Sequence, residues 1–148
     1  MSDDYRDLLE TLLKFNARFL VVGAHALAVH GYPRSTVDID VWIERTPENA
    51  GRVWDALADF GAPLSALGIT QSDFQLPDTV TQLGIEPGRI DILTDVSGVE
   101  FHTAWPNHIS GMVMGVQVPV IGLNDLIANK RSTGRLRDLA DIEGLQGR

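Results

Sequence analysis

The spacing of hydrophobic residues predicts several amphipathic helices. Apolar residues three or four positions apart place one helical stripe over residues 4–15, where acidic residues crowd the first turn. A second stripe covers residues 46–60 and begins with Thr-Pro-Glu, a sequence typical of a helix cap and first turn. Two further helical patterns lie at 123–131 and 135–145, and a Ser-Thr-Gly breaker cluster separates them.

Period-two alternation and short β-branched runs predict the strands. They are expected at 18–23, 37–44, 79–85 and 89–94, with one or two more at 111–122. The first strand ends on a glycine and leads into a short helical segment at 24–31. Glu86-Pro87-Gly88 is a turn signal of the hairpin kind. Residues 61–77 follow neither period, so we interpret them as a loop with one short helix.

Length and composition fit one compact domain covering residues 1–148. The chain has 148 residues, 44% of them hydrophobic, and a chain of this size buries roughly 68–70% of its unfolded surface without needing staples. It contains no cysteine, which excludes thiol catalysis, zinc–thiolate sites and disulfide frameworks. No signal peptide is visible, and the longest apolar runs are far shorter than the ~20 residues of a membrane helix. We therefore expect a soluble, cytoplasmic protein with no membrane partner.

The charge balance is acidic, with one local exception. Twelve Lys and Arg against 20 Asp and Glu give a net charge of −8, which argues against a surface that binds a phosphate backbone throughout. Four basic residues nevertheless fall close together near the C-terminal end of the chain: Lys130, Arg131, Arg135 and Arg137. A local docking patch for an RNA such as tRNA is therefore compatible with the acidic net charge.

Three aspartates are candidates for a metal site. Alternation places Asp38 and Asp40 on one face of a strand, roughly 6.5–7 Å apart, so that both could converge on one cation. Asp91 lies between two isoleucines on a second alternating strand and would complete the set if that strand is a neighbour. Oxygen ligands suit Mg²⁺ or Mn²⁺. The alternative is that the first two aspartates lie on the solvated face of an edge strand. Trp42 shares their face and either borders a base or packs in the core.

A glycine turn precedes the paired acids. Gly23 stands where a strand meets a helix, so backbone amides could approach an anion such as a triphosphate. This turn, the Asp-x-Asp strand and a later Asp together resemble the nucleotidyltransferase superfamily that includes DNA polymerase β. The segments VVGAHALAVHGYPRSTVDIDVWIE, RIDILTD and KRSTGRLRDLADIEGL are similar to small bacterial nucleotidyltransferase-like proteins related to abortive-infection toxins of toxin–antitoxin systems.

The resemblance implies an α+β fold, with a mixed β-sheet flanked by helices on one side, in a nucleotidyltransferase-like core. It implies that Asp38 and Asp40 are the paired metal-binding acids, and that Asp91 is a metal ligand and the general base toward the acceptor hydroxyl. Gly23 falls on the first glycine of the nucleotide-phosphate turn. Ala24 departs from the usual Ser or Gly of that turn, so a side-chain hydroxyl is missing there, although its backbone amide stays available.

The C-terminal segment carries further candidates. The resemblance implies that Lys130 and Arg137 neutralise triphosphate charge and that Asp138 orients one of them. Were 130–141 a single helix, these residues and Asp141 would share one face, although the Ser-Thr-Gly cluster interrupts it. The alternative is that Arg137 and Asp141 form an ordinary i,i+4 ion pair on a surface helix.

Two residues near the glycine turn are also expected at the nucleotide. Arg34, just before the paired acids, would lean toward phosphates or else pair with one of the acids. His25, near the start of the short helix, would reach the nucleotide. His25 and His30 lie five positions apart, about 140° around a helix, so they are not a zinc pair.

The function that follows is an Mg²⁺-dependent nucleotidyltransferase, which moves NMP from an NTP to an acceptor hydroxyl and releases pyrophosphate. The acceptor is an RNA, a protein or a small molecule, and the protein could be a toxin–antitoxin component with a cognate antitoxin. Ala24 and the short chain motivate an alternative, a catalytically degenerate binding or regulatory module with the same fold. A third hypothesis is a metal-dependent phosphohydrolase, in which water takes the place of the acceptor.

Overall fold

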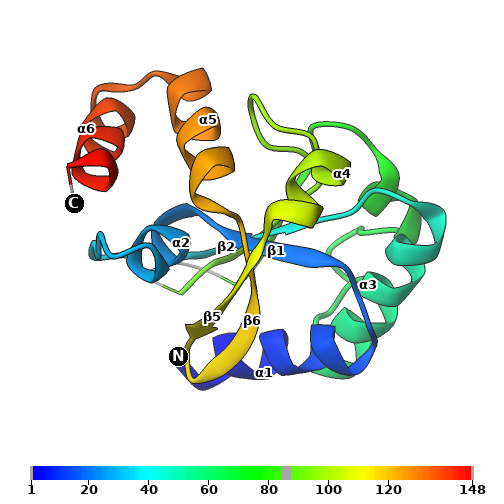
Figure 1. The fold of residues 1–148 in the computed structure, drawn as a ribbon. Coiled ribbons are helices and arrows are strands. Elements are labelled where there is room, and N and C mark those ends of the chain that lie inside the picture. The colour runs from blue at the N-terminus through cyan, green and yellow to red at the C-terminus, as the bar shows by residue number, and fades with distance from the viewer. Residues whose placement is uncertain (1, 85–87, 148) are drawn as a thin grey trace.

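The computed structural model describes residues 2–84 and 88–147 (Figure 1). The helices within this part of the chain are α1 (Ser2–Lys14), α2 (Gly23–Val29), α3 (Pro47–Phe60), α4 (Phe101–Ala104), α5 (Leu123–Thr133) and α6 (Leu136–Gln146), with short 3-10 helices at Gln71–Gln75 and Trp105–Asn107. The strands are β1 (Phe19–Val22), β2 (Ile39–Ile43), β3 (Val80–Leu83), β4 (Ile90–Leu93), β5 (Ile109–Val113) and β6 (Val116–Val120). Helices and strands are interspersed, as predicted.

The strands form one mixed sheet in the order β3-β4-β2-β1-β6-β5. The pairs β2–β4 and β1–β6 are parallel, and the other neighbouring pairs are antiparallel. The predicted α+β class with a mixed sheet is confirmed. The connection between β3 and β4 was predicted to turn at Glu86-Pro87-Gly88, of which Glu86 and Pro87 lie outside the described residues.

Helices cover both faces of the sheet, which corrects the expectation of helices on one side. Figure 1 shows α1 and α3 on one side of the sheet and α4 and α5 on the other. The reason lies in β1 and β2, whose residues are nearly all buried, because a strand that is apolar on both faces needs cover on both. Trp42 of β2 is fully buried and packs edge-on against Phe101 of α4, with ring centroids 5.1 Å apart. Of the two predicted roles for Trp42, bordering a base or packing in the core, the structure therefore shows packing in the core.

Capping residues set the helix ends that the sequence predicted. The Thr46 side chain accepts a hydrogen bond from the Asn49 amide, Pro47 occupies the first turn, and Gly61 ends α3 in the left-handed region at φ 99°. Gly134, at φ 65°, ends α5 in the same way. Residues 130–141 are therefore two helices rather than one continuous helix.

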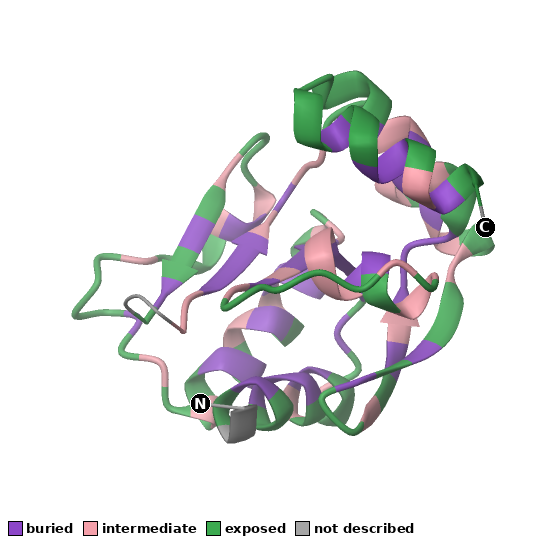
Figure 2. Cartoon of the chain, turned by 90° about the vertical axis from the view of Figure 1, so that its left-hand side faces the viewer, coloured by how far each residue is buried: buried purple, intermediate pink, exposed green. Residues whose placement is uncertain are grey.

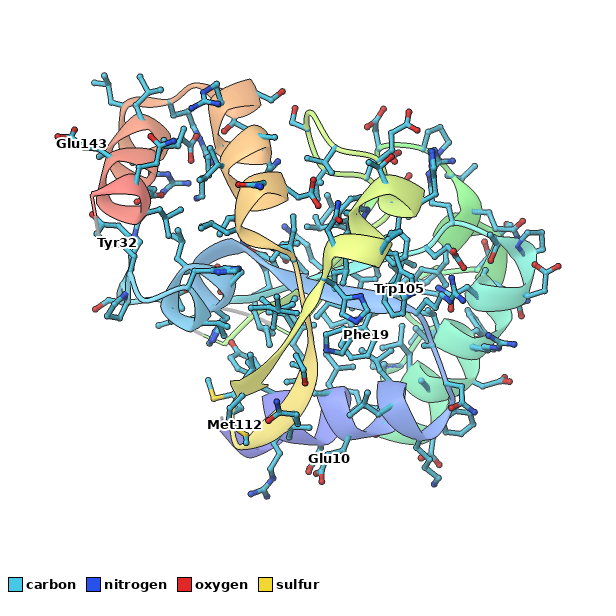
Figure 3. The ribbon with its side chains drawn as sticks, viewed as in Figure 1. Glu10, Phe19, Tyr32, Trp105, Met112 and Glu143 are labelled. Carbon is cyan, nitrogen blue, oxygen red and sulfur yellow. The ribbon has the colours of Figure 1, made fainter. Side chains whose placement is uncertain are left out.

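Buried residues follow the sheet and the inner faces of the helices (Figure 2). One close contact holds α6 in place: Tyr32 lies beside α6 (Figure 3), and a Cβ added at Gly144 would come within 2.4 Å of its ring. No helix within the described residues is long and apolar enough to cross a membrane.

Candidate active site

A cleft of about 480 Å³ opens on the face of the sheet that carries Asp40 and Trp42. Its walls come from the β1–α2 turn, the segment before β2, strand β4, the loop after β4, and the α5–α6 region. The charged lining residues are Arg34, Asp38, Asp40, Arg89, Asp91, Asp95, Lys130, Arg135 and Arg137. The cleft thus brings together most of the candidate residues from the sequence analysis, although the first of them, Gly23, and the last, Arg137, are more than 100 positions apart along the chain.

Two carboxylates lie side by side at the centre of the cleft. Strands β2 and β4 are parallel with Asp40 opposite Asp91, so both side chains project from the same face. Burial raises the pKa of Asp40 to about 6, and the charge of Asp91, a hydrogen bond to Asp91 and the charge of Asp38 add to the rise. A carboxylate pair of this kind is stabilised by a shared proton or by a bound cation.

An arginine that the sequence analysis missed bridges the acids. Arg89 precedes β4, and its Nε and Nη2 lie 2.9 and 3.3 Å from the two carboxylate oxygens of Asp91. Its Nη2 is also 3.3 Å from Asp38 Oδ2. Asp38 itself lies just before β2 rather than within it. The signal was present in the alternation, because residues two apart on a strand share a face and Arg89 is two residues before Asp91.

Gly23 is required by the packing of the site. It adopts φ +69°, and a Cβ at this position would lie 2.3 Å from Asp40 Oδ2. The register explains this proximity, since Asp40 pairs with Val22, the last residue of β1. Gly23 and Ala24 both line the cleft. The glycine therefore leaves room for the carboxylate, and its predicted contact with phosphates stays a prediction.

His25 is not among the residues that line the cleft. Its ring lies edge-on to Tyr5 of α1, with ring centroids 6.4 Å apart. Burial lowers its pKa, against an opposing contribution from the backbone of Asp38. Its Nε2 is buried and finds no hydrogen-bond partner within the described part of the chain. The structure thus places this predicted nucleotide ligand outside the cleft lining and against α1, although it contacts the backbone of Asp38.

Lys130 and Arg34 are paired with acids of α6. The Lys130 ammonium, nearly buried, lies 3.0 Å from Asp141 and 3.4 Å from Asp138. Arg34 Nη1 donates to both oxygens of Asp141, at 2.7 and 2.8 Å. These bonds join α5, α6 and the segment before β2. Much of the positive charge of both residues is neutralised within the protein, so their first effect is to fix one wall of the cleft.

Asp138 is fully buried beneath the α5–α6 connection. It accepts hydrogen bonds from the Thr133 hydroxyl at 2.6 Å and from Arg135 Nε at 2.7 Å. Burial by itself would raise the pKa of this carboxyl, but the bonds from Arg135 and Thr133 and the charge of Lys130 outweigh it and hold the pKa well below its usual range. The residue that was expected to orient a basic side chain therefore contacts two of them.

Arg137 differs from the other cations of the cleft. It is exposed, lines the cleft, and forms no ion pair within the described residues. The predicted i,i+4 pair with Asp141 does not form, because Asp141 is buried against Arg34 and Lys130. Among the described residues that line the cleft, Arg137 is thus the cation whose charge no ion pair neutralises.

The site can be compared with what Mg²⁺ or Mn²⁺ requires. Among the described residues, no group of three or more His, Asp or Glu is arranged to hold a metal ion. Asp40 and Asp91 nevertheless offer two adjacent carboxylates, and Mg²⁺ is often bound through one or two carboxylates together with substrate phosphates. The pair therefore fits such an ion. Asp38 lies nearby, because it contacts Arg89, which also contacts Asp91.

Comparisons with known proteins agree with this architecture. The mixed sheet and its helices define a nucleotidyltransferase-like fold, and two solved structures share it. One is a "putative nucleotidyltransferase" from Thermotoga maritima, with 16% identity, 97% of this chain and 88% of that chain covered, and a TM-score of 0.60. The other is the lincosamide antibiotic adenylyltransferase LnuA with lincomycin bound, with 15% identity, 99% and 96% coverage, and a TM-score of 0.63.

A family model covers nearly the whole chain. The family described as "Nucleotidyltransferase of unknown function (DUF6036)" matches residues 2–146. The protein belongs to this family. None of the curated proteins matches the chain.

Proposed function

We propose that this protein transfers a nucleoside monophosphate from an NTP to an acceptor hydroxyl. The observation that carries the proposal is the in-register pair of Asp40 and Asp91 inside a cleft that Arg137, which has no ion pair within the described part of the chain, also lines. Phosphoryl transfer is catalysed mainly by positioning and by neutralising the charge on the phosphates, which a carboxylate-bound divalent cation and an arginine can provide. The match to a family of nucleotidyltransferases supports the same reaction class.

Each residue has a distinct role in this proposal. Asp40 and Asp91, with Asp38 nearby, would hold Mg²⁺ or Mn²⁺, which when bound would neutralise charge on the phosphates and the leaving pyrophosphate. Arg137 would bind the triphosphate. Asp91 would accept the proton of the acceptor hydroxyl while the acceptor oxygen bonds to the α-phosphorus and the bond to pyrophosphate breaks. Lys130 and Arg34 would hold the cleft wall through Asp141.

The acceptor class stays a prediction, with RNA, a protein and a small molecule as the options. The structural neighbour LnuA is an antibiotic adenylyltransferase, and this chain covers 96% of it. The net charge of −8 also disfavours a large polyanion. Both observations favour testing small hydroxylated molecules first. A cognate antitoxin likewise stays a prediction.

Nucleotide-dependent thermal stabilisation tests the proposal without knowledge of the acceptor. Melting is measured with each of ATP, GTP, CTP and UTP, with and without Mg²⁺, in wild type, Asp40→Asn and Asp91→Asn. A ligand at about 100 times its dissociation constant adds about 2.7 kcal/mol, a shift of several degrees for a chain of this size. Each protein is compared with its own ligand-free form. Asp55→Asn, at an exposed position of α3, is the matched control.

We expect an Mg²⁺-dependent shift with at least one nucleotide in wild type and Asp55→Asn, and its loss in both site variants. A well-folded wild type that no nucleotide stabilises would contradict the proposal. That outcome would favour the second candidate, a binding or regulatory module that has lost transfer. Ala24, which lines the cleft without a hydroxyl, is the observation behind it. A phosphohydrolase would instead release product with water alone as acceptor.

A further inference from the structure

Arg89 contacts two of the three carboxylates that the proposed function gives to a divalent cation, Asp91 and Asp38. Its guanidinium forms a two-pronged contact with Asp91, at 2.9 and 3.3 Å, and reaches Asp38 at 3.3 Å. An arginine fork satisfies both oxygens of one carboxylate, so these oxygens have fewer free lone pairs for another cation. The same charges that would attract a divalent ion are thus partly neutralised from within the chain.

The backbone of Arg89 is held independently of its side chain. The Arg89 carbonyl accepts from the Ile39 amide at 3.1 Å, and its own amide donates to Asp38 Oδ1 at 3.3 Å. The Tyr5 hydroxyl, from α1, also contacts this carbonyl at 3.3 Å and donates to the Val37 carbonyl. The side chain can therefore change rotamer without moving the strand, and it lies in the wall of the open cleft.

We propose that Arg89 is an internal counter-ion that competes with the divalent cation for Asp38 and Asp91 and, once displaced, binds the phosphates of the nucleotide. This inference rests on the proposed function. A guanidinium that pairs two-pronged with a carboxylate pairs equally with a phosphate, and the phosphates would lie in the same cleft. Metal and nucleotide binding are then coupled: the metal alone competes with Arg89, whereas the nucleotide accepts the arginine that the metal releases.

The test measures metal binding rather than activity. Mn²⁺ is titrated into the nucleotide-free protein and followed by electron paramagnetic resonance, in wild type and Arg89→Gln. We expect Arg89→Gln to bind Mn²⁺ alone about 5- to 50-fold more tightly, the range of a typical coupling between two sites. Arg52→Gln, an exposed arginine on α3, makes the same change in net charge and should leave the affinity as it is in wild type.

A second variant keeps the test decisive if Arg89→Gln does not fold. Arg89→Lys retains the charge but not the fork, and it should bind Mn²⁺ with an affinity between those of wild type and Arg89→Gln. With nucleotide present, both variants should lose part of the Mg²⁺-dependent stabilisation that wild type shows. Folding is checked by circular dichroism.

The outcomes separate this inference from the function on which it rests. Wild type that binds Mn²⁺, together with Arg89 variants that bind it no more tightly, would overturn the counter-ion role and leave the proposed function standing. Wild type that binds no Mn²⁺ even with nucleotide would overturn both. Equal gains in Arg89→Gln and Arg52→Gln would show a general charge effect and also overturn the inference.

Discussion

Asp40 shows, at the level of one residue, how the candidate site lowers the stability of the folded protein. Its pKa is raised to about 6 in the folded protein, against an ordinary value of 3.8, because the carboxylate is buried beside Asp91. The folded state therefore binds a proton more tightly than the unfolded state does. The protein is more stable below pH 4 with respect to this group, and loses that contribution as the pH rises from 4 to 6.

Asp40→Asn should accordingly stabilise the metal-free protein at neutral pH. We expect a gain of about 1–3 kcal/mol at pH 7, since one pKa unit corresponds to about 1.4 kcal/mol, and little change at pH 3.5. Melting curves of both proteins in a metal chelator between pH 3.5 and 8 provide the measurement. A difference that is the same at every pH would show that the amide acts through packing and not through the charge.

The pKa of Asp138 is shifted in the opposite direction from that of Asp40, so its effect on stability also has the opposite pH dependence. Its folded-state pKa is depressed below the ordinary 3.8, mainly by Arg135 and Thr133, so its contribution is present in full above pH 4 and is lost as the pH falls further. Asp138→Asn should cost about 3–5 kcal/mol at pH 7, because it leaves Lys130 buried with one partner fewer.

The control for Asp138 lies on the same helix. Glu143 of α6 points away from the protein (Figure 3), and Glu143→Gln should change stability by less than about 0.5 kcal/mol. Urea unfolding at pH 7 compares the two variants. Similar losses in both would mean that the buried ion network contributes little beyond ordinary helix effects.

Arg137 is the residue through which nucleotide affinity is most simply tested. Arg137→Gln should weaken nucleotide binding about 2- to 10-fold, since a charge-assisted hydrogen bond at an exposed site is worth roughly 0.5–1.5 kcal/mol. Arg131→Gln, an exposed arginine of α5 that does not line the cleft, should bind as wild type does. Calorimetric titration with the stabilising nucleotide and Mg²⁺ measures both, and equal affinities in the two variants would remove Arg137 from the site.

At the scale of elements, α6 is held by contacts that its own sequence does not reveal. Gly144 in an α-helix would normally be improved by alanine, by about 0.5–1 kcal/mol. Here an added Cβ would lie 2.4 Å from the Tyr32 ring, so Gly144→Ala should destabilise the protein instead. The Gly144→Ala, Tyr32→Ala double variant should recover part of the loss in a double-mutant cycle. A stabilising alanine would contradict this packing of α6.

The local elements were largely predictable, and their partners were not. Alternation predicted the face of Asp40, and Thr-Pro-Glu predicted the start of α3, because these signals act within a few residues. The parallel pairing of β1 with β6 depends on packing between distant segments, and no local pattern encodes it. The two-sided cover of the sheet did have a local signal, the continuous apolar run of β1.

The candidate site divides in the same way. The placement of Asp40 beside Asp91 agrees with their matching alternation. The bridging role of Arg89 and the burial of Lys130 between Asp138 and Asp141 arise from tertiary contacts, so a basic residue in a plausible motif did not reveal whether its charge was already paired. The burial of His25 against Tyr5 was hidden for the same reason.

At the scale of the whole molecule, charge is distributed unevenly. The chain carries a net charge of −8, yet five of its 12 basic residues line the single cleft that holds the carboxylate pair. Cations concentrated in a cleft of an otherwise acidic protein favour a small polyanion over an extended one. Four carboxylates line the same cleft, Asp38, Asp40, Asp91 and Asp95, so its charges are mixed, as the proposed binding of a divalent cation together with an NTP would need.

The proposed nucleotide and metal site is tested by a crystal structure of the protein with Mn²⁺ and its stabilising nucleotide, with the metal located by anomalous scattering. We expect an anomalous peak between Asp40 and Asp91, the triphosphate in the cleft near Arg137, and Arg89 turned from Asp91 to the phosphates. A nucleotide bound elsewhere, or no anomalous peak at the carboxylate pair under conditions in which the nucleotide binds, would contradict the proposed site.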